Sequence, residues 1–345
     1  MCTLSNLKIT RGDVMSKTLD VVGLGNALMD VVVLLPDDSF LNKKNLNKGE
    51  MQLVDDAQWQ GIYSDLGELK ADIKTGGSCA NTITTLGLLG ASVSYCSQVG
   101  SDDLGRSYAS QLEDACGRHH LVVSDSVATG KCLSLVSKDA ERTMMTDLGA
   151  AVQLGSVEHY KEATASAKVL YLTGYLMFGS TRDHMLDLIK TAKAAGVKIG
   201  FDVADPSVVS ALKQDMFEII RDHVDIVFLN KAEAAALCGG EPEDAIAQLR
   251  EMCEVVVVKL GGKGSMACRG DEEVKVGIYK VKAIDTTGAG DSYAAGFLYG
   301  LVNDWPLIQC AQLGSRVASE AVAQLGAVVR EPEVLASCVA EIRGQ

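Results

Sequence analysis

A glycine-rich run followed by a carboxylate, DTTGAGDSYAAGFLYGL at residues 285–301, is the segment best suited to chemistry. Gly288, Ala289 and Gly290 disfavour a strand, and Asp291 then opens a helix with an apolar stripe. Small residues at a helix N-terminus leave backbone N–H groups free, and the helix dipole adds positive potential, which suits phosphate. A carboxylate there could also serve only as an N-cap. The run alone therefore leaves a phosphate site and a plain helix start as alternatives.

Other phosphate-binding signatures are incomplete or absent. The run GGKGS at residues 261–265 lacks the early glycine that a P-loop places before its Gly-Lys pair. The run VVGLGNALMD at residues 21–30 is close to the dinucleotide-binding pattern G-x-G-x-x-G, but Leu28 replaces the third glycine. Protein-kinase signatures are missing as well. Phosphoryl transfer would need different machinery, and a nicotinamide-dependent dehydrogenase is disfavoured.

Three segments in the right order resemble the ribokinase or PfkB carbohydrate kinase family, which includes adenosine kinase. The run DTTGAGD is similar to the C-terminal signature of that family, and GGSCANTITTLGLLGASVSYCSQVGSDDLG at residues 76–105 is similar to its N-terminal signature. The run NKAE at residues 230–233 matches the N-x-x-E element. The resemblance covers about residues 19–330 and implies an ATP-dependent phosphotransferase with an alcohol acceptor.

The resemblance also implies roles in phosphoryl transfer. Asp291 would be the general base, and Gly288, Ala289 and Gly290 would form the anion hole. These roles fit the chemistry, because positioning and stabilisation of negative charge do most of the catalysis. Arg142, in ERTMMT, would meet the transferring phosphate when a lid closes. The alternative for Arg142 is a surface ion pair with the adjacent Glu141.

ATP and its cations have their own expected ligands. The resemblance assigns ATP to Asn230, Lys259, Gly261, Gly262, Gly264, Thr286, Gly288 and Gly290. Asn230 and Glu233 would hold Mg²⁺ through water, because Mg²⁺ keeps several of its own waters. Glu233 could instead be a solvated residue in the first turn of a helix. Asp285 and Thr287 resemble the place where many family members hold a monovalent cation, and the sequence leaves occupancy by K⁺ open.

The expected acceptor pocket follows from a further match. In the family the first strand ends in G-N-x-x-x-D, and Asn26 and Asp30 fall on that pattern. A carboxylate that accepts two vicinal hydroxyls suits a ribose-like diol. Gly76, Gly77 and Asn81 would line the same pocket, where the glycines let a ligand approach the backbone. The alternative is that Asn26 and Asp30 only shape a turn.

The acceptor itself is expected to be a nucleoside. The segments GNALMD, KGEMQLVD and ERTM resemble the adenosine and nucleoside kinase branch more than the ribokinase or fructokinase branch. We therefore expect transfer to a primary hydroxyl of an adenosine-like nucleoside, with a ribose or fructose type of sugar as the alternative. Leu28, Met51, Leu148 and Phe178 could form a purine slot, although core packing explains each equally well. A noncatalytic nucleotide-binding protein is a remote alternative, because it would be expected to have lost Asp291.

The elements that must position these residues alternate along the chain. Strands are expected at 19–25, 93–100, 169–174, 198–203, 225–230 and 255–261, and helices at 79–90, 103–117, 181–195, 207–221 and 242–252. Near-continuous Val, Ile and Leu runs separated by helices predict a parallel sheet buried on both faces. The expected fold is α/β, doubly wound and ribokinase-like.

Two segments depart from this alternation. Residues 31–60 and 121–150 carry short β-like runs and polar turns, so we expect them to form a small β-rich lid. Residues 16–345 would then be one kinase domain with that lid, and residues 1–15 a disordered tail.

Composition limits the partners. A formal net charge of -13 disfavours a nucleic-acid partner, which needs clustered Lys and Arg. Ten scattered cysteines without a secretory signal suggest reduced thiols in a cytoplasmic protein. No apolar run approaches the roughly 18 residues that a membrane span needs. We expect ATP and a small-molecule substrate as partners, and a monomer or a homodimer.

Overall fold

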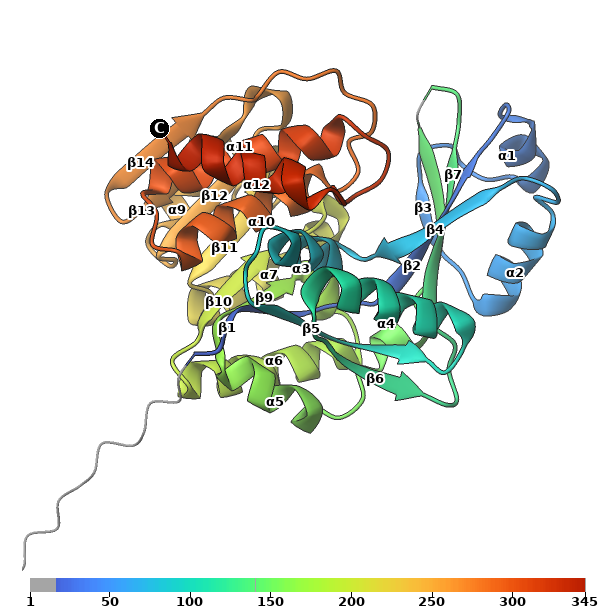
Figure 1. Ribbon diagram of the computed structural model, residues 1–345, viewed down its shortest axis with the longest axis horizontal. Coiled ribbons are helices and arrows are strands. Elements are labelled where there is room, and N and C mark those ends of the chain that lie inside the picture. The colour runs from blue at the N-terminus through green and yellow to red at the C-terminus, as the bar shows by residue number, and fades with distance from the viewer. Residues whose placement is uncertain (1–16, 140, 345) are drawn as a thin grey trace, which may run out of the picture.

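The computed structural model describes residues 17–139 and 141–344, so the tail predicted at residues 1–15 lies outside the described residues. A nine-stranded main sheet organises the chain in the order β14-β13-β12-β11-β10-β9-β1-β5-β6 (Figure 1). Its strands are β1 (Leu19–Leu24), β5 (Val93–Gly100), β6 (His120–Ser124), β9 (Ala167–Thr173), β10 (Lys198–Asp202), β11 (Ile226–Asn230), β12 (Val255–Lys259), β13 (Ser265–Arg269) and β14 (Glu272–Val276).

Helices cover both faces of this sheet. One face packs on α5 (Glu158–Ala165), α6 (Ser180–Ala194), α7 (Pro206–His223), α8 (Lys231–Cys238) and α9 (Pro242–Leu249). The other face packs on α3 (Ser78–Leu88), α4 (Asp103–Cys116), α10 (Ala289–Val302), α11 (Leu307–Val322) and α12 (Pro332–Arg343). Successive strand residues enter opposite cores, as Val21 and Val22 of β1 do, and both are fully buried. This two-sided burial explains the continuous apolar runs and confirms the doubly wound fold.

One edge of the main sheet differs from the all-parallel prediction. The strands from β12 to β6 are parallel, but β13 and β14 pair antiparallel with their neighbours. The short connections explain the difference, because adjacent strands joined by a tight turn must run in opposite directions. The sheet is therefore mixed, with a parallel centre.

A second, five-stranded sheet stands beside the main sheet in the order β3-β8-β7-β2-β4 (Figure 1). It consists of β2 (Leu28–Leu34), β3 (Met51–Leu53), β4 (Ala71–Gly76), β7 (Gly130–Val136) and β8 (Arg142–Asp147). The helices α1 (Ser39–Lys44) and α2 (Asp56–Ser64) cover one face through Leu41 and Trp59. The expected lid segments differ from this sheet at two places: β6 belongs to the main sheet, and β4 joins the small one.

The connection order places the candidate site. From β1 the chain continues to β5 and β6 on one side, and later runs from β9 to β12 on the other. Such a reversal is where open α/β sheets bind ligands, at the carboxyl ends of the strands. Among the described residues, no helix is both long and apolar enough to cross a membrane.

Candidate active site

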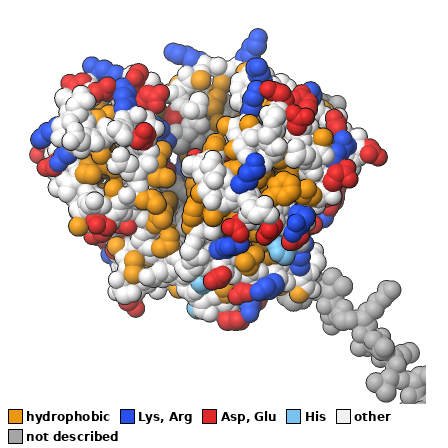
Figure 2. Space-filling view, turned by 180° about the vertical axis from the view of Figure 1, so that it is seen from behind, with side chains coloured by type: hydrophobic (Ala, Val, Ile, Leu, Met, Phe, Trp, Pro, Cys, Tyr) orange, Lys and Arg blue, Asp and Glu red, His pale blue; other side chains and the backbone are white. Residues whose placement is uncertain are grey.

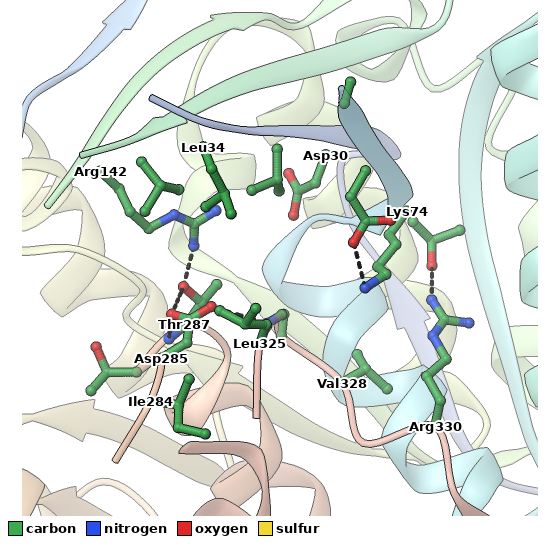
Figure 3. Close-up of a pocket in the computed structure, with 18 of the residues that line it drawn as sticks. Asp30, Leu34, Lys74, Arg142, Ile284, Asp285, Thr287, Leu325, Val328 and Arg330 are labelled. Atoms are coloured by element: carbon green, nitrogen blue, oxygen red, sulfur yellow. Dashed lines mark hydrogen bonds and ion pairs between the residues drawn. The ribbon is translucent and has the colours of Figure 1, made fainter. Parts of the chain in front are cut away.

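A groove separates the small sheet from the main body, and Figure 2 shows it running between the two lobes. Within it lies a cavity of about 450 Å³. Its walls come from β2 and β4 of the small sheet and from two loops of the main body, residues 283–287 and 325–330. Asp30 and Arg142, from the small sheet, and Asp285 to Thr287, from the main body, all line it (Figure 3). The cavity therefore brings together predicted residues that are far apart in the sequence.

Asp291 lies in the first turn of α10 and is held by two residues of α3. Ser78 Oγ donates to Asp291 Oδ1 at 2.7 Å, and Asn81 Nδ2 donates to Asp291 Oδ2 at 2.9 Å. Burial raises the pKa of Asp291, and the two hydrogen bonds oppose that rise. Each carboxylate oxygen keeps a further lone pair for another donor. The side chain is thus fixed in orientation and able to accept a proton.

The helix start differs slightly from the prediction. Helix α10 begins at Ala289, and Gly288 is its N-cap with a left-handed φ of 70°. A Cβ at residue 288 would collide with the backbone of Ala327, so glycine is required there. Ala289 and Gly290 occupy the first turn, where N–H groups lack partners within the helix. Helix α10 is buried almost all round, since it packs between α3 and α11.

Lys259 lies at the end of β12 and approaches this helix start. Its Nζ forms an ion pair of 2.7 Å with Asp202 Oδ2, at the end of β10. A Cβ at Gly290 would lie 3.3 Å from that Nζ, so the ammonium group stands close to the first turn of α10. Burial alone would lower the pKa of Lys259, but Asp202 and Glu233 outweigh it and raise the pKa. A positive charge is thereby held beside the expected anion hole.

Asn230 and Glu233 form a capping box at the start of α8. Glu233 Oε2 accepts from the Asn230 backbone N–H at 2.7 Å, and Asn230 Oδ1 accepts from the Glu233 N–H at 2.9 Å. The solvated alternative for Glu233 is wrong, because only 1% of the residue is exposed. Burial, and then the charge of Asp202, raise the pKa of Glu233 to about 7. A buried carboxylate with this excess of negative charge fits a nearby divalent cation.

The remaining expected ATP residues lie on turns. Gly261 belongs to the 3₁₀ helix η3 (Gly261–Lys263), and a Cβ at Gly261 or Gly262 would meet open space. Gly264 has a φ of 90°, and a Cβ there would collide with the backbone of Val276, so its glycine serves the turn between strands. Thr286 is exposed and lines the cavity. Gly261, Gly262 and Gly264 thus lie on the turn that joins β12 to β13, and Thr286 lies on the loop before α10.

The expected acceptor residues other than Asn81 lie around β2. Asp30 lies inside β2, with its carboxyl group against Gly76, where any Cβ would collide with it. Gly77 has a φ of 93° and approaches the Asn26 carbonyl in the same way. The Asn26 side chain donates to the Ala151 carbonyl at 3.2 Å. Burial raises the pKa of Asp30 to about 6; Arg142 opposes this shift, and Asp291 adds to it. Asp30 therefore does not shape a turn but faces a partly desolvated site near Asp291.

Arg142 joins the small sheet to the loop before α10. Its Nε donates to Ser134 Oγ at 2.9 Å, and its Nη1 donates to Thr287 Oγ1 (Figure 3). Thr287 in turn donates to Asp285 through its N–H at 2.9 Å and its hydroxyl at 2.6 Å. Arg142 is not the surface partner of Glu141, because its guanidinium points to the loop that begins the anion hole. The Arg142 guanidinium therefore extends from the small sheet to the loop that precedes α10.

Three residues at the site were not predicted: Ser78, Asp202 and Tyr175. Ser78 stands inside the motif GGSCAN, so its position after Gly77 could have indicated it. Asp202 and Tyr175 follow or end the parallel strands β10 and β9, where functional side chains are common. Tyr175 is 38% exposed, and burial followed by the carboxylates of Asp205 and Asp291 raises its pKa. Tyr175 therefore offers a partly exposed aromatic surface just after β9.

The comparisons with known proteins decide the family. A model of the pfkB family of carbohydrate kinases matches residues 69–333. The chain belongs to the PfkB family of carbohydrate kinases. The solved adenosine kinase from Sinorhizobium meliloti is similar at 33% identity with a TM-score of 0.84, covering 94% of this chain and 99% of that chain. A probable sugar kinase from Rhizobium etli is similar at 30% identity with a TM-score of 0.85, covering 96% and 99%.

A curated relative points in another direction. The 5-dehydro-2-deoxygluconokinase of Shouchella clausii is 30% identical over 72% of this chain and 80% of its own length. As a PfkB kinase, the protein is a phosphotransferase with an alcohol group as acceptor. Its relatives include both adenosine kinases and sugar kinases. Of the described residues, no group of three or more His, Cys, Asp or Glu side chains is arranged to hold a metal ion.

Proposed function

We propose that this PfkB kinase transfers the γ-phosphoryl group of ATP to a primary hydroxyl of an adenosine-like nucleoside. The observation that carries the proposal is the position of Asp291. Its carboxylate lies at the N-terminus of α10, oriented by Ser78 and Asn81, and is electrostatically coupled to Asp30. A proton acceptor, an anion-binding helix start and a diol-binding carboxylate thereby meet at one place.

In the proposed reaction, the acceptor hydroxyl gives its proton to Asp291 as its oxygen bonds to the γ-phosphorus. The bond between that phosphorus and the β,γ-bridging oxygen breaks, and ADP leaves with the electron pair. The raised pKa of Asp291 makes it a stronger base than an ordinary carboxylate. The first-turn N–H groups of α10, Lys259 and Arg142 stabilise the charge on the transferring group.

ATP and Mg²⁺ fit the residues on the nucleotide side. Asn230, Lys259 and the glycine turn at 261–264 would hold the nucleotide with Thr286 and the α10 start. Glu233 would face Mg²⁺ through water, since its buried carboxylate has the raised pKa of an undercompensated charge. When bound, Mg²⁺ supplies charge neutralisation on the phosphates. Asp285 and Thr287 would lie beside a monovalent cation such as K⁺, since Asp285 orders the Thr287 loop through its N–H and hydroxyl.

A nucleoside is favoured over a simple sugar by exposed apolar side chains among the residues expected to form a purine slot. Met51 is 49% exposed and Phe178 is 46% exposed, so neither is a core residue. Tyr175, in the 3₁₀ helix η2 (Gly174–Met177) after β9, adds an aromatic ring that is 38% exposed. Such exposed apolar side chains suit the faces of a purine. The similarity to the Sinorhizobium meliloti adenosine kinase supports the same choice.

A monomer is also part of the proposal. Helices α1 and α2 cover the outer face of the small sheet with a core that includes Leu41, Trp59 and Met145. That face is therefore closed to the lid of a second copy, while Leu34, Met51, Leu53 and Ile73 of the same sheet are exposed. We place the protein in the cytoplasm, where ATP is available and nine described cysteines would stay reduced.

A sugar of the ribose or fructose type remains the second candidate, favoured by the similarity to the Rhizobium etli probable sugar kinase. An assay of ADP release with adenosine, inosine, ribose and fructose separates the two. Adenosine should give the highest kcat/KM, and Asp291→Asn should abolish turnover on every acceptor. A preference for ribose or fructose would replace the nucleoside assignment, whereas full activity of Asp291→Asn would remove the proposed mechanism.

A further inference from the structure

The cavity extends beyond the acceptor residues to a wall that carries positive charge. Lys74 and Arg330 line this wall, on the side away from Arg142 (Figure 3). Lys74 comes from β4 of the small sheet, and Arg330 follows the loop at 325–329 in the main body. None of the expected roles in phosphoryl transfer uses either residue. The two cations therefore need a separate explanation.

Arg330 is half-buried and makes no ion pair with any carboxylate in the described chain. Its Nη2 donates to the hydroxyl of Thr75 at 3.0 Å, a neutral partner. Burial lowers the pKa of Arg330, and the more distant carboxylates of Asp114 and Asp72 offset only part of that effect. A guanidinium group has five N–H donors, so most of those of Arg330 have no acceptor within residues 17–139 and 141–344. A partly buried, undercompensated arginine is the arrangement that binds oxyanions in pairs of hydrogen bonds.

Lys74 does not form an ion pair with Asp30, the residue opposite it on the neighbouring strand. It stands directly opposite Asp30 in the pairing of β2 with β4. Its Nζ nevertheless pairs with Asp72 at 2.7 Å and lies 3.7 Å from a Cβ placed on Gly326. Asp72 also lines the cavity, but its side chain is 62% exposed, so the pair is weak and Lys74 can exchange Asp72 for a bound anion.

The acidic and apolar neighbours define what can enter. Asp285 accepts from Thr287 at Oδ1 and from the Gly326 N–H at Oδ2 at 3.0 Å, and Thr287 links it to the Arg142 guanidinium. The charge of Asp285 therefore has a cation on its own side of the cavity, away from Lys74 and Arg330. Leu325 and Val328 contribute apolar surface between the two cations and the loop before α10 (Figure 3). Apolar surface beside the charges reduces screening by water and strengthens their attraction for an anion.

We propose that Arg330 and Lys74 form a binding site for a small oxyanion, a phosphate or carboxylate group, next to the acceptor position. Arg330 binds two oxygens through its free N–H donors, and Lys74 supplies the second charge from the small sheet. The anion comes either free from solution or as a substituent of the acceptor held at Asp30. The site goes beyond the proposed function, because it does not depend on which alcohol receives the phosphoryl group.

Inorganic phosphate is the first probe, titrated calorimetrically into the full chain. The nucleotide side is filled beforehand with Mg²⁺ and a non-hydrolysable ATP analogue, so that phosphate cannot report the α10 start. We expect one phosphate per chain. Arg330→Gln should weaken binding by about tenfold or more, because it removes a charge-assisted bidentate contact. Lys43→Gln is the matched control, since Lys43 is exposed on α1 and carries the same charge, and it should leave binding unchanged.

Lys74→Gln is a second test in case Arg330→Gln misfolds. The Lys74 side chain is 41% exposed, so this substitution should leave the fold intact. It should weaken phosphate binding several-fold with an unchanged melting temperature. Ribose 5-phosphate then identifies the source of the anion. Tighter binding than phosphate, lost in Asp30→Asn, means that the acceptor carries the oxyanion; equal binding that is insensitive to Asp30→Asn means a free anion. No phosphate binding by the wild type, or equal binding by both cavity variants and the wild type, would overturn the site.

Discussion

Ser78→Ala should shift the acid limb of the pH–rate profile to higher pH. Ser78 Oγ donates to Asp291 Oδ1 at 2.7 Å, and this bond stabilises the ionised carboxylate. A hydrogen bond to a charged group contributes about 1.5–3 kcal/mol net, and one pKa unit corresponds to about 1.36 kcal/mol. Its loss should therefore raise the pKa of Asp291 by about one to two units, nearer one because Asn81 still donates to the other oxygen. A base works only when deprotonated, so the variant needs a higher pH.

The assay is kcat/KM from ADP release, measured with the preferred acceptor across the acid limb. Below the pKa of both proteins, Ser78→Ala should be about tenfold less active than the wild type; above both, the two should agree within about threefold. Thr85→Val is the matched control, since it removes from the same helix a buried hydroxyl with no hydrogen-bond partner among the described residues. An acid limb that stays in place while activity falls equally at every pH would refute the electrostatic reasoning.

Three further changes test other parts of the site. Arg142→Gln should lower kcat at least about tenfold with little change in acceptor KM, because it removes charge from the transferring phosphoryl group; an unchanged kcat in steady-state assays would contradict this. The acceptor KM should rise as pH falls through about 6, where Asp30 becomes protonated, and Asp30→Asn should show a high KM that no longer depends on pH in this range. Gly288→Ala should lower the free energy of unfolding by about 1–3 kcal/mol, seen in denaturant titrations, since its φ is 70° and its Cβ would meet Ala327; wild-type stability would show that the loop relaxes freely.

The sequence predicted the parts of the fold that depend on local pattern. The helix expected at 103–117 is α4 (Asp103–Cys116), and the strand expected at 93–100 is β5, because periodicity and capping residues act within a few positions. The assignment of residues 121–124 to the lid was wrong. Those residues pair with β5, and a strand as short as HLVVS shows no sequence signal for which sheet it will join.

In the candidate site, too, residues within local motifs could be predicted and long-range contacts could not. Asp291 and Asn81 stand in recognisable motifs, so both could be named from the sequence, and the structure brings them within 2.9 Å. The ion pair of Lys259 with Asp202 could not be predicted, since the two residues are 57 positions apart and meet only because β10, β11 and β12 are adjacent. Contacts of this kind depend on strand order, which local pattern does not determine.

The ion pair between Lys259 and Asp202 largely determines the balance of charge at the proposed catalytic site. Asp202, Glu233 and Asp291 share one buried cation, Lys259, and their mutual repulsion contributes to the raised pKa of Glu233 and of Asp291. A free triphosphate would add negative charge to a place that already holds more carboxylates than cations. The Mg²⁺ complex of ATP brings its own positive charge, so it relieves this repulsion as it binds. Because Asp291 accepts its proton only after the nucleotide is bound, the base strength that matters is the one left once Mg²⁺ has offset part of this repulsion.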